Sequence, residues 1–178
     1  VKVIINEDAA TERIDVIVQN RNIVRDYFLE RDHTHLFFLD SDLTGGVNAL
    51  TLLCKHEHPL VTGWYLNGVI LDGKERIRPV AYAAVDKNRV RQLKISEVLQ
   101  AKLIPLAVSG LGCTLMARSI IENITFRRIS DHGGEDVAFF KDVFDMLGER
   151  PWLDTRIKFI HHKFPVGDGR NAYLNPNN

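Results

Sequence analysis

Short apolar segments alternate with amphipathic segments along the chain, which predicts an α/β protein. Residues 35–39 form a short apolar run bounded by polar residues, a pattern typical of a buried strand. Runs of β-branched residues at 1–5 and 14–18 predict two earlier strands, and apolar spacing predicts a helix over residues 20–31. A turn at residues 44–46 opens a second helix. Strands and helices in this order form a βαβ-type unit, which predicts a largely parallel sheet.

The alternation continues through the second half of the chain. Residues 72–74 predict a hairpin turn, and residues 115–123 have helical spacing. Residues 136–147 predict an amphipathic helix that ends at Gly148. The apolar residues of this helix that we expect to face inward are Val137, Phe140, Phe144 and Leu147. Further strands are predicted over residues 60–65, 69–71, 76–85, 103–108 and 156–161.

The length of 178 residues suits one domain with its own core. We therefore expect a single α/β, Rossmann-like domain over residues 1–166, with a central, mostly parallel mixed sheet flanked by helices. Residues 167–178 are rich in Gly, Asn and Pro, and we expect them to form a loose tail.

Charge and cysteine content narrow the function classes. Lys+Arg and Asp+Glu balance at 23 each, which argues against a protein that binds duplex nucleic acid. The apolar runs are too short for a membrane span, and we expect a cytoplasmic protein. Cys54 and Cys113 form no CxxC motif. We expect both to be buried thiols of a reduced compartment, although a single disulfide is also compatible with the sequence.

Two carboxylates, Asp40 and Asp42, follow the apolar run at residues 35–39. Ligands of open α/β sheets bind at the carboxyl ends of the strands. In an extended chain Ser41 points away from its neighbours, so both carboxylates lie on one side. Their mutual repulsion favours a compensating divalent metal, which would hold a phosphorylated substrate. The alternative is an ordinary loop in which Asp42 or Thr44 caps the next helix.

A second group, Gly133-Gly134-Glu135-Asp136, stands at the start of a predicted helix. Capping and the helix dipole alone favour glycines and acids at this position. Adjacent glycines also let the backbone approach a ligand closely, and an acid at a helix start is well placed as a general base.

The strand predicted over residues 156–161 ends in two histidines, His161 and His162. Either could complete a metal site begun by Asp42, and a carboxylate with an imidazole suits Mn²⁺ as well as Mg²⁺. Gly110 and Gly112 follow an apolar run and could admit a ligand. Trp64 and Tyr65 could stack on a sugar or a base, or could belong to the core or its rim. The other clustered metal-type residues are interpreted as structural: His33, His35, Cys54, His56 and His58.

Taken in order, these segments resemble the GT-A fold glycosyltransferases, especially the family-2-like group. The resemblance extends over residues 19–162, and the length also resembles that of a small glycosyltransferase of an archaeal virus. Each motif is loose, but their order and spacing together are fairly specific. The motifs are Arg21-Asn22, HLFFLDSD at 35–42, PLVTGWY at 59–65, GLGCTL at 110–115, GEDVAFF at 134–140, LDTR at 153–156, and His161.

The resemblance implies a metal-dependent transfer of a sugar from a nucleotide-diphosphate sugar to a hydroxyl of a glycan, protein or lipid. It implies that Asp42 and His161 bind the metal, with Asp40 close to it and near the ribose or sugar. Asp136 matches the catalytic base of inverting members, with Glu135 beside it contacting acceptor or donor. Arg21 matches a basic residue near the nucleotide. From their place in turns, we also expect Gly110, Gly112 and Gly134 to lie beside the bound donor. The strand and loop that hold the nucleobase in this group look shortened or missing ahead of Val1.

Two other classes stay open. Asp40-Ser41-Asp42-Leu43-Thr44 also fits the DxDxT motif of haloacid-dehalogenase-type phosphohydrolases, with Asp40 as nucleophile. That family needs a lysine between its second motif and its late acids, and residues 110–140 contain arginines but no lysine. The third class is a non-catalytic module that binds nucleotide sugars on the same fold.

Overall fold

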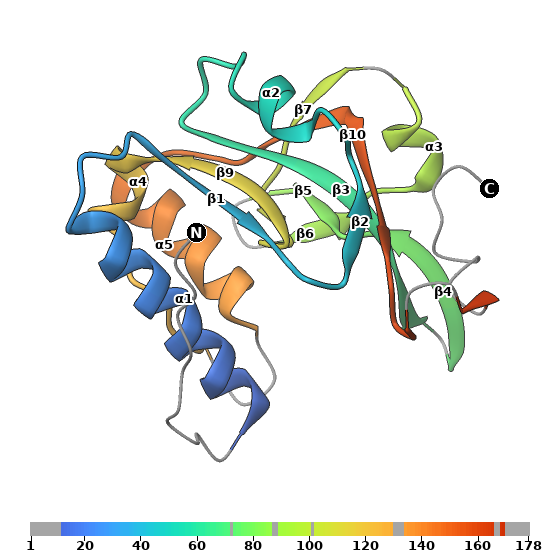
Figure 1. Ribbon diagram of the computed structural model, residues 1–178. Helices are drawn as coiled ribbons and strands as arrows, with labels where there is room; N and C mark the ends of the chain where they lie inside the picture. Colours follow the sequence, from blue (N-terminus) through green and yellow to red (C-terminus); the bar gives the residue numbers. More distant parts are fainter. Residues whose placement is uncertain are drawn as a thin grey trace.

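The computed structural model describes residues 12–71, 73–86, 89–100, 102–129, 134–165 and 168–169 (Figure 1). A central sheet has the strand order β1-β9-β3-β10-β2, with β4 paired to β3 and β7 paired to β10. A smaller sheet has the order β6-β5-β8. The strands of the central sheet are β1 (His35–Leu39), β2 (Leu43–Gly45), β3 (Leu60–Leu71), β4 (Lys74–Pro79), β7 (Leu103–Pro105), β9 (Cys113–Ala117) and β10 (Trp152–His161). Those of the smaller sheet are β5 (Ala81–Ala84), β6 (Val90–Gln92) and β8 (Val108–Ser109).

Helices cover both faces of the central sheet (Figure 1). Side chains from α1, α4 and α5 meet Phe38, Leu60 and Met116 of the sheet in one hydrophobic cluster. The short helix α2 packs Ala49 and Leu53 against the opposite face. The helices are α1 (Arg13–Leu29), α2 (Ala49–Leu53), α3 (Ile95–Val98), α4 (Arg118–Ile121) and α5 (Glu135–Leu147). The protein is therefore a mixed α/β structure with a central sheet flanked by helices.

The prediction of a mostly parallel sheet is wrong. Among the described strand pairs of the central sheet, only β3 and β10 run parallel, and the others are antiparallel. The reason is β9, which lies antiparallel between β1 and β3. Because two reversals restore the direction, β1, β3 and β10 still point the same way, and the carboxyl ends of β1 and β10 share one edge of the sheet.

Two predicted elements have a different conformation. Residues 14–18, predicted as a strand, belong to α1, because a helix propagates more easily from an existing turn than it starts anew. Residues 115–123, predicted as a helix, begin in β9 and only then form α4. The strand predicted at residues 1–5 lies outside the described residues, as does the predicted tail at 167–178 apart from Asp168 and Gly169.

Several other predictions are confirmed. The strand at residues 35–39 is β1, and residues 76–85 form parts of β4 and β5. The hairpin predicted at residues 72–74 joins β3 to β4, where Gly73 has a φ of +70°. Within the described ranges, the structure contains no helix that is both long and apolar enough to cross a membrane.

The inward face of α5 differs in part from the prediction. Phe140 is buried and Leu147 packs against the core, but Val137 and Phe144 are 39% and 47% exposed. Phe139 is fully buried instead, stacked on Phe126. The shift follows from the cover that α5 gives the sheet, which buries a face centred on Phe139, Phe140 and Val143.

The two cysteines are free thiols in different environments. Cys113 is buried in β9, and burial raises the pKa of its thiol to about 12. Cys54 is exposed at the C-terminal end of α2, so the expectation of two buried thiols holds only for Cys113.

The two phenylalanines of α5 test this packing. We expect Phe139→Ala to lower the free energy of unfolding by about 3–5 kcal/mol, because it leaves a cavity in the core. Phe144→Ala is the matched control on the same helix and should cost less than about 1 kcal/mol, since its ring is half exposed and contacts Arg150. Urea unfolding followed by circular dichroism measures both. Equal losses would contradict the observed orientation of α5.

Candidate functional site

Residues that are distant in sequence meet at the carboxyl edge of β1 and β10. Asp40 follows β1, and its N–H donates to the carbonyl of Gly112, just before β9 (2.9 Å). At the end of β10 the N–H of His162 donates to the carbonyl of Asp42 (2.8 Å). The acids after β1, the glycines before β9 and the histidines after β10 therefore surround one edge of the sheet, as ligand sites of open sheets do.

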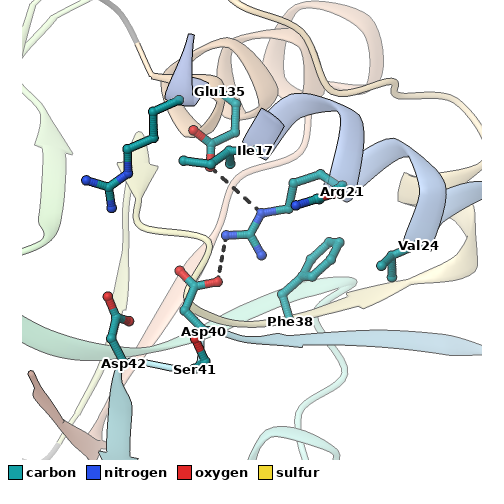
Figure 2. Close-up of a pocket in the computed structure, with 10 residues that line it drawn as sticks. Ile17, Arg21, Val24, Phe38, Asp40, Ser41, Asp42 and Glu135 are labelled. Atoms are coloured by element: carbon teal, nitrogen blue, oxygen red, sulfur yellow. Dashed lines mark hydrogen bonds and ion pairs between the residues drawn. The ribbon is translucent and has the colours of Figure 1, made fainter. Parts of the chain in front are cut away.

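Asp40 and Asp42 lie in a tight turn between β1 and β2. The N–H of Leu43 donates to the carbonyl of Asp40 (3.1 Å), so the chain is not extended as the sequence analysis assumed. Both carboxylates still line one pocket, together with Ser41, residues of α1 and Glu135 of α5 (Figure 2). The turn gives the two acids different partners.

Arg21 is the partner of Asp40. Its Nη2 donates to Oδ1 of Asp40 at 2.8 Å, and its Nε lies 3.8 Å from Oε1 of Glu135 (Figure 2). The guanidinium also lies over the ring of Phe38, and the side chain is only 11% exposed. This residue therefore joins α1, the turn after β1 and the start of α5, and places Arg21, Asp40 and Glu135 in one pocket wall.

His161 is the partner of Asp42. Nε2 of His161 lies 3.3 Å from Oδ2 of Asp42, while Nε2 of His162 lies 2.6 Å from the hydroxyl of Thr44. Of the two histidines that the sequence left as alternatives, His161 is thus the one whose ring faces Asp42. The described residues contain no group of three or more His, Cys, Asp and Glu side chains gathered as a metal site.

Asp136 and Glu135 begin α5 beside this pocket. Burial raises the pKa of both carboxyls, and the charge of Asp136 raises that of Glu135 further. Backbone N–H groups, including that of Val137 at 2.8 Å from Oδ1, partly oppose the shift at Asp136. An added Cβ at Gly134 would lie 2.6 Å from the same oxygen, so the glycine leaves room for Asp136. Gly133 lies outside the described residues.

Gly110 and Gly112 contact protein side chains rather than the pocket. A Cβ at Gly112 would lie 2.8 Å from Oδ2 of Asp40, and one at Gly110 would overlap the hydroxyl of Tyr65. Neither glycine is among the residues that line the pocket around Asp40. Their contribution is to let Asp40 and Tyr65 approach the backbone before β9.

Arg13 had no predicted role at the site, and Tyr65 had none for its hydroxyl. Arg13 lines the pocket on the same face of α1 as Arg21, two helical turns away. Because residues 14–18 were predicted as a strand, Arg13 and Arg21 were not expected to lie on one helix. From the sequence, Tyr65 was a candidate for stacking on a sugar or base or for packing at the core, but its hydroxyl also experiences the charges of the acids. Burial raises its pKa, and the charges of Asp40 and Asp136 raise it further, so it stays protonated.

A separate polar group lies at the other end of β10. His56 and Arg156 bind the buried Asp154, at 2.9 Å and 2.6 Å from Oδ2. Burial alone would raise the pKa of Asp154, but these hydrogen bonds outweigh it and lower the value to about 2. His58 stacks on Trp152. Each of these side chains has a partner within the protein, as expected for structural residues.

The raised pKa of Asp136 predicts a cost in stability. Because the folded state holds this proton more tightly than the unfolded state, stability is highest below the ordinary value of 3.8 and falls as pH rises through the folded-state pKa. We expect Asp136→Asn to raise the free energy of unfolding at pH 7.5 by about 0.5–2 kcal/mol, and the gain to shrink toward pH 4. Urea unfolding between pH 4 and 8 measures it.

Asp145→Asn on the exposed side of α5 is the control for that substitution. Asp145 is half exposed and forms an ion pair with Lys141, so its replacement should change stability by less than about 0.5 kcal/mol. A loss of stability in Asp136→Asn at pH 7.5 would show that the ionised carboxylate stabilises the fold.

Comparison with known proteins adds a likeness of fold. The chain matches no protein-family model. No curated protein matches it in sequence. Among solved structures, it is similar to the crystal structure of A197 from STIV, with 21% sequence identity and a TM-score of 0.52. The alignment covers 82% of this chain and 67% of the A197 chain. The likeness concerns the α/β architecture alone.

Proposed function

We propose that the protein is a metal-dependent glycosyltransferase of the GT-A type, which transfers a sugar from a nucleotide-diphosphate donor to an acceptor hydroxyl. The observation that supports this most is the meeting of Asp40, Asp42 and His161 with Glu135 and Asp136 at one edge of the sheet. These residues come from three separate parts of the chain. The motif resemblance assigns them to one reaction.

The Asp42–His161 pair fits a divalent cation. Two neighbouring ligands of an octahedral ion with bonds of about 2.1 Å lie about 3 Å apart. The observed 3.3 Å between Oδ2 of Asp42 and Nε2 of His161 is close to that separation. A carboxylate and an imidazole suit Mn²⁺ or Mg²⁺. Asp40 accepts a hydrogen bond from Arg21 rather than from His161. We therefore assign its main role to the ribose or sugar hydroxyls, and only a secondary role to the metal.

In the proposed mechanism Asp42 and His161 would hold the cation. When bound, the cation would neutralise the charge that develops on the leaving nucleoside diphosphate. The acceptor oxygen attacks the anomeric carbon, and the bond from that carbon to the diphosphate oxygen breaks with its electron pair on the oxygen. The acceptor proton passes to the Asp136 carboxylate, and the sugar is transferred with inversion.

The position of Asp136 suits a general base. Its raised pKa lies closer to neutral pH than that of an exposed aspartate, which favours proton transfer. Glu135, on the pocket side of the same turn, is paired with Arg21 and is assigned to contact with donor or acceptor.

A phosphohydrolase with Asp40 as nucleophile is the second candidate. Its attack needs a free Asp40 carboxylate and a cation that holds the phosphate. In the structure Asp40 accepts a hydrogen bond from Arg21, and the cations among the described pocket residues are Arg13 and Arg21 rather than lysines. We therefore rank this reaction below sugar transfer, and product analysis separates the two.

Substitutions of Asp42 and Asp136 test their separate roles in cation binding and in proton transfer. With MnCl₂ and a panel of nucleotide sugars, we expect the wild type to release nucleoside diphosphate slowly. Asp42→Asn should abolish Mn²⁺-dependent donor binding in isothermal titration calorimetry. Asp136→Asn should keep donor binding but lower turnover by about 10²–10⁴-fold, because it removes the base. Asp145→Asn is the matched control and should leave both properties unchanged.

Each other product has its own meaning. Release of inorganic phosphate from phosphomonoesters would identify a phosphohydrolase. Binding of nucleotide sugars without any turnover would identify a binding module. Full activity of Asp136→Asn would refute the assignment of the base.

A further inference from the structure

The side chain of Tyr65 contacts two parts of the candidate site, His161 and the glycine turn before β9. Tyr65 is in β3, where it pairs with Phe159 of β10, two residues before His161. Its ring meets that of His161 edge to face, with centroids 5.3 Å apart. Its hydroxyl lies against Gly110, two residues from Gly112, which touches the Asp40 carboxylate. The ring of Tyr65 therefore contacts His161, and its hydroxyl lies at the turn before β9 on which the Asp40 carboxylate rests.

The hydroxyl of Tyr65 has no partner within the described parts of the chain. No hydrogen bond joins it to a described residue, and its oxygen is not among the fully enclosed polar atoms that lack a partner, so a ligand can reach it. The neighbouring residue in β3, Trp64, has a partner within the protein, since its Nε1 donates to the carbonyl of Thr155 at 2.9 Å. The free donor of Tyr65 is therefore directed at a group that the protein itself does not supply.

The surroundings of this hydroxyl define the chemistry of its partner. A tyrosine hydroxyl is a neutral donor at physiological pH, and the charges of Asp40, Asp136 and Asp42 act on this one, with the Arg21 guanidinium acting in the opposite sense. A phosphate brought directly to this point would be repelled by the carboxylates unless a cation intervened. A sugar ring suits the position better, because its hydroxyls donate to carboxylates while its oxygens accept from the phenol.

We infer that the Tyr65 hydroxyl donates a hydrogen bond to an oxygen of the donor sugar, and so selects a polyhydroxylated ring over the bare nucleotide. This inference rests on the proposed function. It assigns to Tyr65 a specificity role that the motif resemblance does not include. Gly110 is needed for the same hydrogen bond, since any side chain at this position would displace the Tyr65 hydroxyl.

The experiment compares a nucleotide sugar with its own nucleoside diphosphate. UDP-glucose, UDP-N-acetylglucosamine and GDP-mannose are first titrated into the wild type with MnCl₂, and the tightest ligand is kept together with UDP or GDP. Tyr65→Phe retains the ring against His161 and removes only the hydroxyl. We expect it to weaken binding of the nucleotide sugar about 2- to 13-fold and to leave that of the nucleoside diphosphate within about twofold.

Two further variants make the result specific. Tyr27→Phe makes the same change near the far end of α1 and should alter neither affinity. Gly110→Ala should weaken sugar binding as Tyr65→Phe does, because the new methyl group displaces the hydroxyl. Combined with Tyr65→Phe, it should add no further loss in affinity, since the two substitutions remove the same interaction.

The outcomes separate this inference from the proposed function. Equal weakening of both ligands by Tyr65→Phe, or no weakening of either, would overturn the role of Tyr65 while the glycosyltransferase proposal stands. Titration with Mn²⁺ alone should give the same affinity in wild type and Tyr65→Phe, which shows that His161 is undisturbed. If none of the nucleotide sugars binds the wild type with Mn²⁺, the proposed function and this inference fall together.

Discussion

The candidate site depends on one positively charged side chain, the Arg21 guanidinium, which lies among several acidic side chains. Asp40, Asp42, Glu135 and Asp136 gather at one edge of the sheet, and Arg21 is the cation that binds two of them directly. Removing one partner of a buried ion pair leaves an uncompensated charge, and the loss here is smaller than for a fully buried pair because the Asp40 side chain is 38% exposed. Arg21 therefore links α1 to the turn after β1 and to the start of α5, and these three elements line the pocket (Figure 2). The packing of α1 on Phe38 and Phe126 reinforces the same arrangement.

A ligand of this site must compensate the negative charge of the carboxylates that Arg21 does not neutralise. Arg21 neutralises part of the acidic cluster, and the raised pKa values of Glu135 and Asp136 show that burial works against full ionisation of the rest. A divalent ion at Asp42 and His161 would reduce the same repulsion. The excess of negative charge in the acidic cluster would then have two consequences. It would give the site affinity for a divalent ion, and it would destabilise the protein when that ion is absent. Such a trade-off between stability and function is common at active sites.

Local patterns in the sequence predicted the parts of the site that depend on single elements. The short apolar run before Asp40 and the helix after Gly134 have clear local signals, and both elements form as predicted. The strand β9 had no such signal, because the apolar stretch around Leu115 and Met116 suits a helix as well as a strand. Its place between β1 and β3 depends on partners more than 50 residues away. The place of Arg13 in the pocket also depends on α1 starting at Arg13, just before a run of β-branched residues that favoured a strand.

The insertion of β9 changes the topology without moving the site. An antiparallel strand between β1 and β3 reverses the local pairing twice, so the ends of β1 and β10 still meet at one edge. It also brings Gly110 and Gly112 to that edge, where a wholly parallel sheet would place the start of a strand at the opposite side. The glycines that read as a ligand loop in the sequence therefore become the backbone against which Asp40 and Tyr65 rest. The strand whose prediction failed is the one that fixes the Tyr65 hydroxyl among the acids, and this makes the mixed topology a part of the proposed sugar site.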